Sequence, residues 1–295
     1  MEYKKTRRKN NMFPMIFITC AVMLLTGCFQ VSQKVWLNPD GSGKMRIEAM
    51  LPIITLGQET NIEKMTLEMK KQVEEIMNKS KGIDAWSGVS YSLTDSGQIS
   101  FSATAYFPDI SGIDLHNLPV PDISFQPEGE DKKVLLIDPG KKDIKPAPEK
   151  REELSEEEIT RRIKEERIKF NQAKNMMSAI LSDVRIESSF NLPGRVVSST
   201  NLKKEPDGFY SFSITGKRII DITSSLIQDD SWLRKQVMSG KDAMNNEILL
   251  SDEINEKMFG EKGPLKAVVS GPMKPFFDYA AEVAVTRKKS QAGTP

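Results

Sequence analysis

Alternation of apolar and polar side chains is the feature that most limits how this chain can fold. In residues 44–51 apolar side chains stand at every second position, and residues 99–107 repeat the pattern over a longer stretch. A period of two is what a β-strand with one buried face requires. Turn-forming residues precede both stretches: Pro, Asp and Gly at 38–43, and Asp and Gly at 94–97. The pattern therefore predicts antiparallel β-hairpins.

The same interpretation extends along the chain. Strand pairs are predicted at 34–37 with 44–51, 89–93 with 99–107, 123–125 with 134–137, and 184–192 with 210–214; a further strand is predicted at 265–269. The second pair carries Ser, Thr and Tyr on one face, so we expect that side of its sheet to meet solvent. Three prolines between 108 and 121 predict an irregular segment there.

Two long amphipathic helices are predicted between these strands. Thr60-x-x-Glu63 has the residues of a capping box, and the apolar residues that follow it recur at spacings of three and four as far as Ile76. Ser155-x-x-Glu158 is a second capping box, and no Gly or Pro interrupts the chain from there to Asp183. The second helix would be about 27 residues long, or roughly 40 Å.

The first half of that second helix is strongly charged. Glu157/Arg161 and Glu158/Arg162 are pairs four residues apart, which support a helix face in contact with water. Two interpretations stay open: residues 155–183 project as an arm that binds a partner, or the charges form the solvated face of an ordinary helix.

The remaining segments complete an α+β fold, in which antiparallel β-hairpins pack with the two long amphipathic helices. Residues 229–238 predict a short helix, 275–285 fit either a helix or a strand, and 288–295 predict a frayed tail. The order hairpin, helix, hairpin occurs at 34–107 and again at 122–215, which suggests two ββαββ units without residue identity between them.

The N-terminus predicts export. Five Lys or Arg residues within positions 4–9 precede an apolar, uncharged run at 12–25, the layout of a secretory signal peptide. A helix of these 14 residues would span about 21 Å, whereas the hydrocarbon core of a bilayer is about 30 Å thick. A cleaved signal peptide is therefore favoured over a permanent membrane span.

The end of that run, Leu25-Thr26-Gly27-Cys28, resembles the lipobox of bacterial lipoproteins. The resemblance implies that residues 1–27 are removed and that Cys28 carries the acyl chains, including palmitate, that anchor the protein in a membrane. More than one acyl chain gives durable anchoring. The alternative is a plain signal peptide with an incidental cysteine. Phe29, where enteric lipoproteins retained in the inner membrane have Asp, favours the outer membrane.

Charge and composition restrict the partners. Lys and Arg number 42 and Asp and Glu 41, so no net field attracts nucleic acid, and we predict no nucleic-acid partner. Removal of residues 1–27 would leave 37 basic and 40 acidic residues, a net charge of −3. Acyl chains, rather than charge, would then be the main hold on the membrane.

The few cysteine and histidine residues argue against several classes of enzyme. Cys20 lies in the predicted signal peptide and Cys28 would be acylated, which leaves no thiol for catalysis, a disulfide or a metal. His116 is the only histidine and lies in a loop-like stretch, and the chain has no Gly-x-Ser-x-Gly. Residues 40–43 lack the spacing of a phosphate-binding loop. We therefore predict no catalytic residue, cofactor or metal.

Several turns of the body resemble those of LppM-like and related bacterial lipoprotein domains. They are Asp40-Gly-Ser-Gly43, Leu192-Pro-Gly-Arg-Val196 and Asn201. The resemblance implies an α+β fold of strand pairs around a helix and brings no catalytic residues. The charged helix at 155–167 and the chain after 225 depart from that family's pattern. We expect a first part at 28–140, an exposed linker at 141–154 and a second part at 155–287.

Three functions are compatible with the sequence. The favoured hypothesis is a membrane-anchored, non-enzymatic module that binds another envelope protein or has a structural role; the oligomeric state cannot be read. A carrier or sensor of an apolar ligand is the first alternative, suggested by Met65, Met69, Met176 and Met177 on helix faces. The second is a hydrolase that uses two carboxylates.

Overall fold

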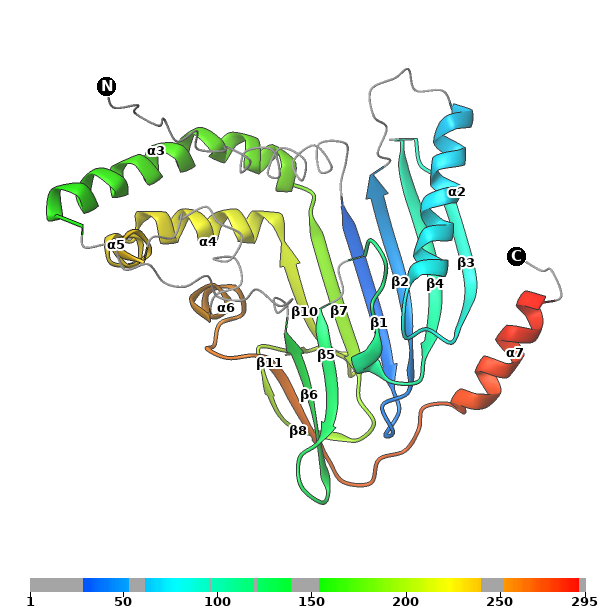
Figure 1. Cartoon of the computed structure of the whole chain (residues 1–295). Helices are drawn as coiled ribbons and strands as arrows, with labels where there is room; N and C mark the ends of the chain where they lie inside the picture. Colours follow the sequence, from blue (N-terminus) through cyan, green and yellow to red (C-terminus); the bar gives the residue numbers. More distant parts are fainter. Residues whose placement is uncertain are drawn as a thin grey trace, which may run out of the picture.

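The structure, a computed structural model, describes residues 29–52, 62–95, 97–118, 121–138, 154–239 and 252–291. Two mainly antiparallel sheets and helices make up the fold, which confirms the predicted α+β class. Cys28 with the rest of the signal segment, Thr60 of the first capping box and most of the predicted linker lie outside the described residues. Figure 1 shows the sheets side on, with a group of helices extending from one end of the larger sheet.

The first two predicted hairpins are confirmed. Strand β1 (Gln30–Leu37) pairs with β2 (Gly43–Pro52), and β3 (Ala85–Leu93) pairs with β4 (Gln98–Phe107). Because β2 also pairs with β4, the four strands are adjacent in the order β3-β4-β2-β1. Helix α2 (Ile62–Lys79) connects the two hairpins.

The alternation in these strands divides buried from accessible side chains, as predicted. Every second residue of β2 and β4 is buried in one core, and α2 covers this face with three of its own apolar side chains. The α2 residues in the core are Met69, Val73 and Ile76. On the other face of the sheet, Tyr106 is buried in a small apolar cluster instead of meeting solvent, because the C-terminal helix packs there.

The larger sheet is extended by strands from the second half of the chain. Strand β7 (Arg185–Asn191) runs parallel to β1, and β10 (Tyr210–Thr215) pairs with β7 in antiparallel fashion, as the sequence predicts for 184–192 and 210–214. A two-residue strand, β9 (Lys203–Lys204), pairs with the start of β10. The described strands of this sheet thus follow the order β3-β4-β2-β1-β7-β10-β9.

A second, four-stranded sheet packs against the same core. It contains β5 (Asp122–Pro127), β6 (Lys132–Asp138), β11 (Leu265–Ser270) and β8 (Arg195–Thr200), in the order β5-β6-β11-β8. The third predicted hairpin and the predicted strand at 265–269 are therefore present. The second hairpin-helix-hairpin segment is divided between the two sheets, because β7 and β10 join the larger sheet while β5, β6 and β8 join the smaller one. Only the first segment forms a contiguous ββαββ unit, and both predicted parts of the chain share one core.

Four helices form a separate cluster at one end of the larger sheet. They are α3 (Glu156–Leu181), α4 (Gly216–Gln228), α5 (Asp230–Met238) and α6 (Asp252–Phe259). Their apolar core contains Phe170 and Trp232, with Ile163 and Met258 packed against it. Ser155 caps α3, as the sequence indicates, and Asp229 caps α5. Helices α4 and α6 are not among the predicted helices, although Thr215, the cap of α4, precedes Ile219, Ile222 and Leu226 at helical spacing.

Helices α3 and α4 continue two paired strands. Helix α3 ends at Leu181, shortly before β7, and α4 begins directly after β10. Because Arg185 of β7 is in register with Thr215 of β10, the two helices are brought together and pack along each other. Helix α3 therefore packs on α4 and α5.

The C-terminal segment folds as a helix, α7 (Tyr279–Gln291), so residues 288–291 of the predicted frayed tail are helical. Helix α7 packs on β3. Lys44 Nζ lies 2.9 Å from a Glu282 carboxylate oxygen, and the Tyr279 hydroxyl donates to Asp84 at 2.7 Å. Burial, and then the hydrogen bond to Asp84, raise the pKa of Tyr279. Between β4 and β5 the chain is irregular, as predicted, apart from the short helix η1 (Ile110–Gly112).

Candidate functional site

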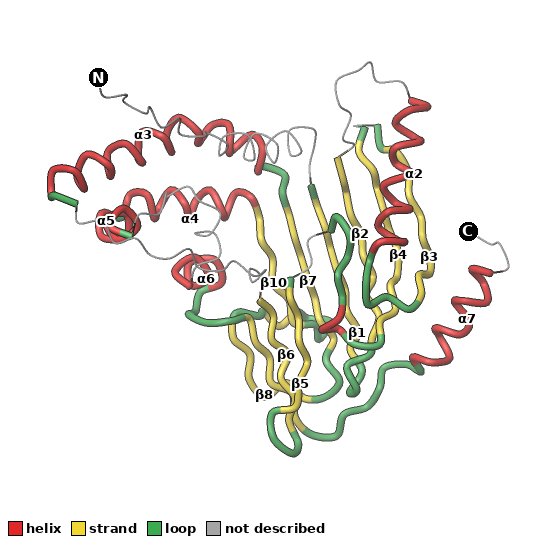
Figure 2. Tube along the Cα trace, in the orientation of Figure 1, coloured by secondary structure: helices red, strands yellow, loops and turns green. Residues whose placement is uncertain are grey.

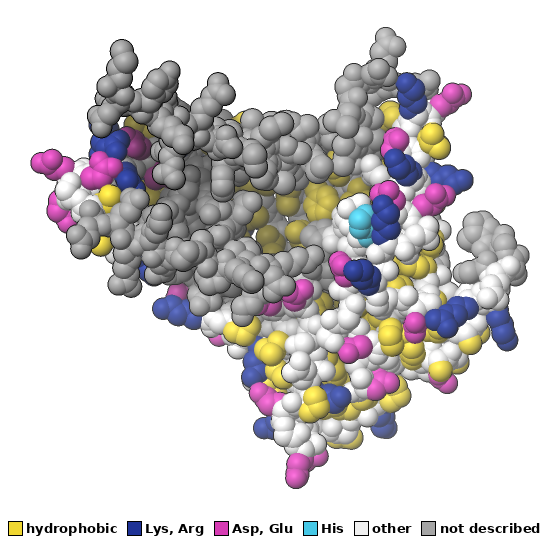
Figure 3. Space-filling view, viewed as in Figure 1, with side chains coloured by type: hydrophobic (Ala, Val, Ile, Leu, Met, Phe, Trp, Pro, Cys, Tyr) yellow, Lys and Arg dark blue, Asp and Glu magenta, His cyan; other side chains and the backbone are white. Residues whose placement is uncertain are grey.

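A groove follows the outer edge of strand β10. Its volume is about 890 Å³, and residues of β1, β7, β8, β9 and β10, of α6 and of the turns between them line it. We call it the β10 groove. On the described part of the face drawn in Figure 3, acidic and basic side chains are interspersed.

The groove exists because β9 is only two residues long and begins at Lys203. β9 pairs only with Tyr210 and Ser211, whereas β10 continues to Thr215. Asn201, between β8 of the second sheet and β9, has φ of 59°, the left-handed conformation with which the chain turns from one sheet to the other. The Phe209 backbone oxygen accepts a hydrogen bond from Glu205 on the outer side of β10. Backbone groups of alternate residues in a strand point to the same side, so those of Ser213, four residues later, also point to this open edge.

One wall of the groove is fixed by the Asn201 side chain. Its Nδ2 donates to the backbone oxygens of Glu261 (3.0 Å) and Gly263 (3.3 Å), and its Oδ1 accepts from the Glu261 backbone N–H at 3.0 Å. Three bonds from one side chain hold the turn after α6 against the sheet edge. Sequence reasoning noticed Asn201 only as part of a family-like turn; its preference for the left-handed region is the signal that indicates a structural role.

Replacement of Asn201 by alanine is expected to lower the free energy of unfolding by about 2–3 kcal/mol. The variant loses hydrogen bonds of about 1 kcal/mol each and places a less tolerant residue in the left-handed region. Asn201→Gly loses the same bonds but accepts the backbone conformation, so its loss should be smaller by about 1 kcal/mol. Urea denaturation of the two variants measures the difference. Equal stability of both variants would mean that the backbone conformation contributes nothing.

Aromatic side chains form the apolar part of the groove. The Phe212 ring stacks on Phe190 at a centroid distance of 6.5 Å and meets Phe259 of α6 edge to face at 6.0 Å. Phe209 meets Trp36 edge to face at 5.6 Å, and Lys34 Nζ lies 5.2 Å from the Phe209 ring centroid. These contacts fix the rings before any partner binds.

The polar part contains carboxylates that are already hydrogen-bonded. Glu205 accepts from the Ser211 hydroxyl at 2.7 Å and pairs with Lys203, and Asp207 lies 3.6 Å from Lys34 Nζ. The Ser211 hydrogen bond, followed by that of Lys203, lowers the pKa of Glu205 below its ordinary 4.5. The stabilisation from this carboxylate is therefore present above its ordinary pKa and is lost as the pH falls through the lowered value.

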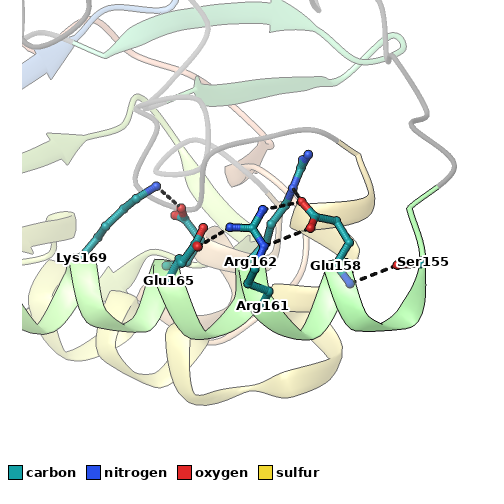
Figure 4. Close-up of polar contacts among 7 residues, drawn as sticks. Ser155, Glu158, Arg161, Arg162, Glu165 and Lys169 are labelled. Atoms are coloured by element: carbon teal, nitrogen blue, oxygen red, sulfur yellow. Dashed lines mark hydrogen bonds and ion pairs between the residues drawn. The ribbon is translucent and has the colours of Figure 1, made fainter.

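The charged half of α3 is also internally paired. Ser155 Oγ accepts from the Glu158 backbone N–H at 3.2 Å, and Arg161 contacts Glu158 (2.6 Å) and Glu165 (2.5 Å) in place of the predicted Glu157 (Figure 4). The predicted Glu158–Arg162 pair is present at 2.9 Å. Hydrogen bonds from Arg161 and then Arg162 lower the pKa of Glu158 to about 2. This half of the helix has the paired charges of a solvated face.

The other residues singled out in the sequence are separate from the groove. His116 is half-buried in a turn after η1, where its backbone N–H donates to Ser80 Oγ at 3.1 Å, so the predicted loop position is confirmed. The lipobox residues 25–28 are outside the described residues. No helix in the described part of the chain is long and apolar enough to cross a membrane.

Comparison with known proteins gives little similarity. No family model matches this chain, and no curated protein matches its sequence. Among solved structures, the folded domain of the LppM protein of Mycobacterium tuberculosis, determined by NMR, is similar over 85% of this chain and 93% of that domain. The sequence identity is 12% and the TM-score is 0.31, so the likeness to LppM is weak in sequence and in structure.

Proposed function

We propose that this protein is a membrane-anchored lipoprotein of the bacterial cell envelope that binds another envelope protein through the β10 groove and catalyses no reaction. The observation that carries the binding role is the groove itself, an open edge of a sheet bordered by fixed aromatic rings and paired polar groups. The anchor would be Cys28, two residues before β1 begins. Phe29 after the cysteine favours the outer membrane.

A binding role fits the groove better than a carboxylate hydrolase does. Such an enzyme needs one carboxyl group that keeps its proton near neutral pH, which requires a raised pKa. The lowered pKa of Glu205 is a shift in the opposite direction, because its neighbours donate to the ionised form. Ionised, hydrogen-bonded carboxylates suit recognition of a polar partner.

A carrier of apolar ligands is less well supported. The groove is larger than the roughly 300 Å³ that small ligands need, but charged and hydroxyl side chains alternate with its aromatic rings. The methionines that suggest a carrier lie elsewhere: Met69 is in the main core, Met65 packs against it, Met177 packs in the helix cluster, and Met176 is exposed. The open edge favours a polar, extended segment of a protein partner, which could pair with β10.

Photo-crosslinking tests this proposal in intact cells. A photoreactive residue at Ser213, exposed beside the groove, is expected to capture one defined envelope protein. The same residue at Ser92, exposed on the opposite edge strand β3, should not capture that protein. Intact-mass analysis of the purified protein should give a chain that begins at acylated Cys28. The same products at both positions, or none at either, would contradict binding at the groove, and an unmodified N-terminus would contradict the anchor.

A further inference from the structure

The predicted anchor determines which end of the molecule meets the membrane; this step rests on the proposed acylation of Cys28. Strand β1 begins at Gln30, and a residue extends the chain by at most about 3.6 Å, so the Cα atoms of residues 28 and 30 are separated by no more than about 7 Å. Phe29 accepts a hydrogen bond at its backbone oxygen from Arg185 N–H at 3.0 Å, which fixes the chain just after the anchor. The start of β1 must therefore lie next to the bilayer.

The helix cluster leaves the larger sheet at this same end. Gln30 of β1, Arg185 of β7 and Thr215 of β10 are in register side by side. Helix α3 ends at Leu181, just before β7, and α4 begins directly after Thr215. In Figure 1, α3 extends outward from the end of the larger sheet at which β1 starts, with α4 between it and the smaller sheet. The C-terminal half of α3 is thus the helical segment that leads to the anchored end.

That half of α3 has an unusual surface. Ile168 and Met176 are 46% and 49% exposed, and their spacing of eight places them on one helix face with exposed Gln172 between them. Residues 167–181 include Arg167, Lys169 and Lys174 but no acid, whereas 156–166 contain five acids and three bases. The last turn of α3 has no basic residue, so the helix dipole does not account for this distribution.

We propose that the Ile168–Met176 face of α3 rests on the bilayer beside the lipid anchor. A helix in this position places the Ile168 and Met176 side chains among the acyl chains, with Lys169, which pairs with Glu166, at the border of this face beside the lipid phosphates. Arg167 lies on another side of α3, where it bonds to Ile227, Gln228 and Asp230. The paired acidic half then lies farther from the anchor, where its charges remain in water. The acyl chains and α3 would together fix the orientation of the domain, with the β10 groove on the rigid body that they hold.

Site-directed spin labelling of the full, acylated protein in phosphatidylethanolamine–phosphatidylglycerol vesicles tests the contact. Cys20 is removed with the signal peptide and Cys28 is acylated, so an introduced cysteine is the single free thiol. A nitroxide at Gln172→Cys is expected to collide more often with oxygen than with a water-soluble nickel chelate. A nitroxide at Glu130→Cys, in the exposed β5–β6 turn, should show the reverse.

Exchange of the apolar side chains completes the test. Ile168→Ser with Met176→Ser should move the label at 172 toward water, whereas Val285→Ser, at a 52% exposed position on α7, should leave it unchanged. If the protein has the mass of the acylated chain and the nitroxides at 172 and 130 collide equally often with the nickel chelate, the α3 contact is overturned. The proposed function is left standing by that result. A label at 172 shielded from both reagents would indicate a protein partner and would also overturn the α3 contact. Protein without the acyl mass would instead contradict the proposed anchor.

Discussion

Phe190→Ala is expected to lower the free energy of unfolding by about 3–5 kcal/mol, the usual cost of emptying the site of a buried phenylalanine. Phe190 is 0% exposed, lies in β7 between β1 and β10, and stacks on Phe212. The core at this point receives side chains from both halves of the chain. The cavity left by the ring cannot collapse readily, because paired strands on both sides hold the backbone in place.

Urea denaturation measures this loss. Trp36 in β1 and Trp232 in the helix cluster report on different parts of the molecule. Val197→Ala is the matched control, because Val197 also lies in a strand but is 49% exposed, and a change within about 0.5 kcal/mol is expected there. Equal stability of the two variants would mean that the core is not packed as described.

Gly216→Ala is expected to destabilise the protein by about 3 kcal/mol, although alanine is the better helix former. Gly216 is the first residue of α4, and a Cβ atom added to it would lie 1.7 Å from the backbone oxygen of Leu181 and 2.6 Å from its carbonyl carbon. The Gly216 N–H also donates to Val184 at 2.9 Å, so α4 cannot shift without losing this bond. Helix propensity alone predicts that the free energy of unfolding rises by about 1 kcal/mol. The sign of the measured change therefore shows whether helix propensity or the clash with Leu181 dominates.

Gly112→Ala is the control for this substitution. A Cβ atom at Gly112 would have no atom within 4 Å, and its φ lies outside the left-handed region. We expect a change within about 0.5 kcal/mol at Gly112. The Trp232 fluorescence of the Gly216 variant should also change, since Trp232 packs in the cluster that α4 helps to form. A Gly216 variant as stable as the wild type would mean that α3 and α4 do not approach this closely.

The strands of the larger sheet could be predicted because their signal is local. Met45, Ile47 and Ala49 alternate with Arg46 and Glu48, and burial on one face follows from that alternation wherever the hairpin packs. The capping residue Ser155 acts on its own helix, so it could be predicted in the same way. The pairing of β1 with β7 could not be predicted, because it joins residues more than 150 positions apart. The two strands are parallel, so no short turn between them marks the pairing in the sequence.

The candidate site was largely hidden in the sequence. Asn201, Ser211 and Phe259 come from a turn, a strand and a helix, and none lies in a catalytic or ligand motif. Their proximity follows from the late start of β9 and from α6, a short helix that the sequence does not predict. Helix α4 was missed although Thr215 could have indicated it, since the apolar run of 219–227 also fits a strand.

The sequence by itself determined the local elements: the strand faces, the long helices with their caps, and the lipobox-like end of the N-terminal segment. Each of these depends on residues close together in the chain, where side-chain period and backbone preference act directly. The tertiary structure alone decided that β8 and β7 enter different sheets, that α3 packs on helices, and that an open edge remains beside β10. These outcomes depend on which surfaces bury the most apolar area together, a property of the whole chain that no local pattern contains.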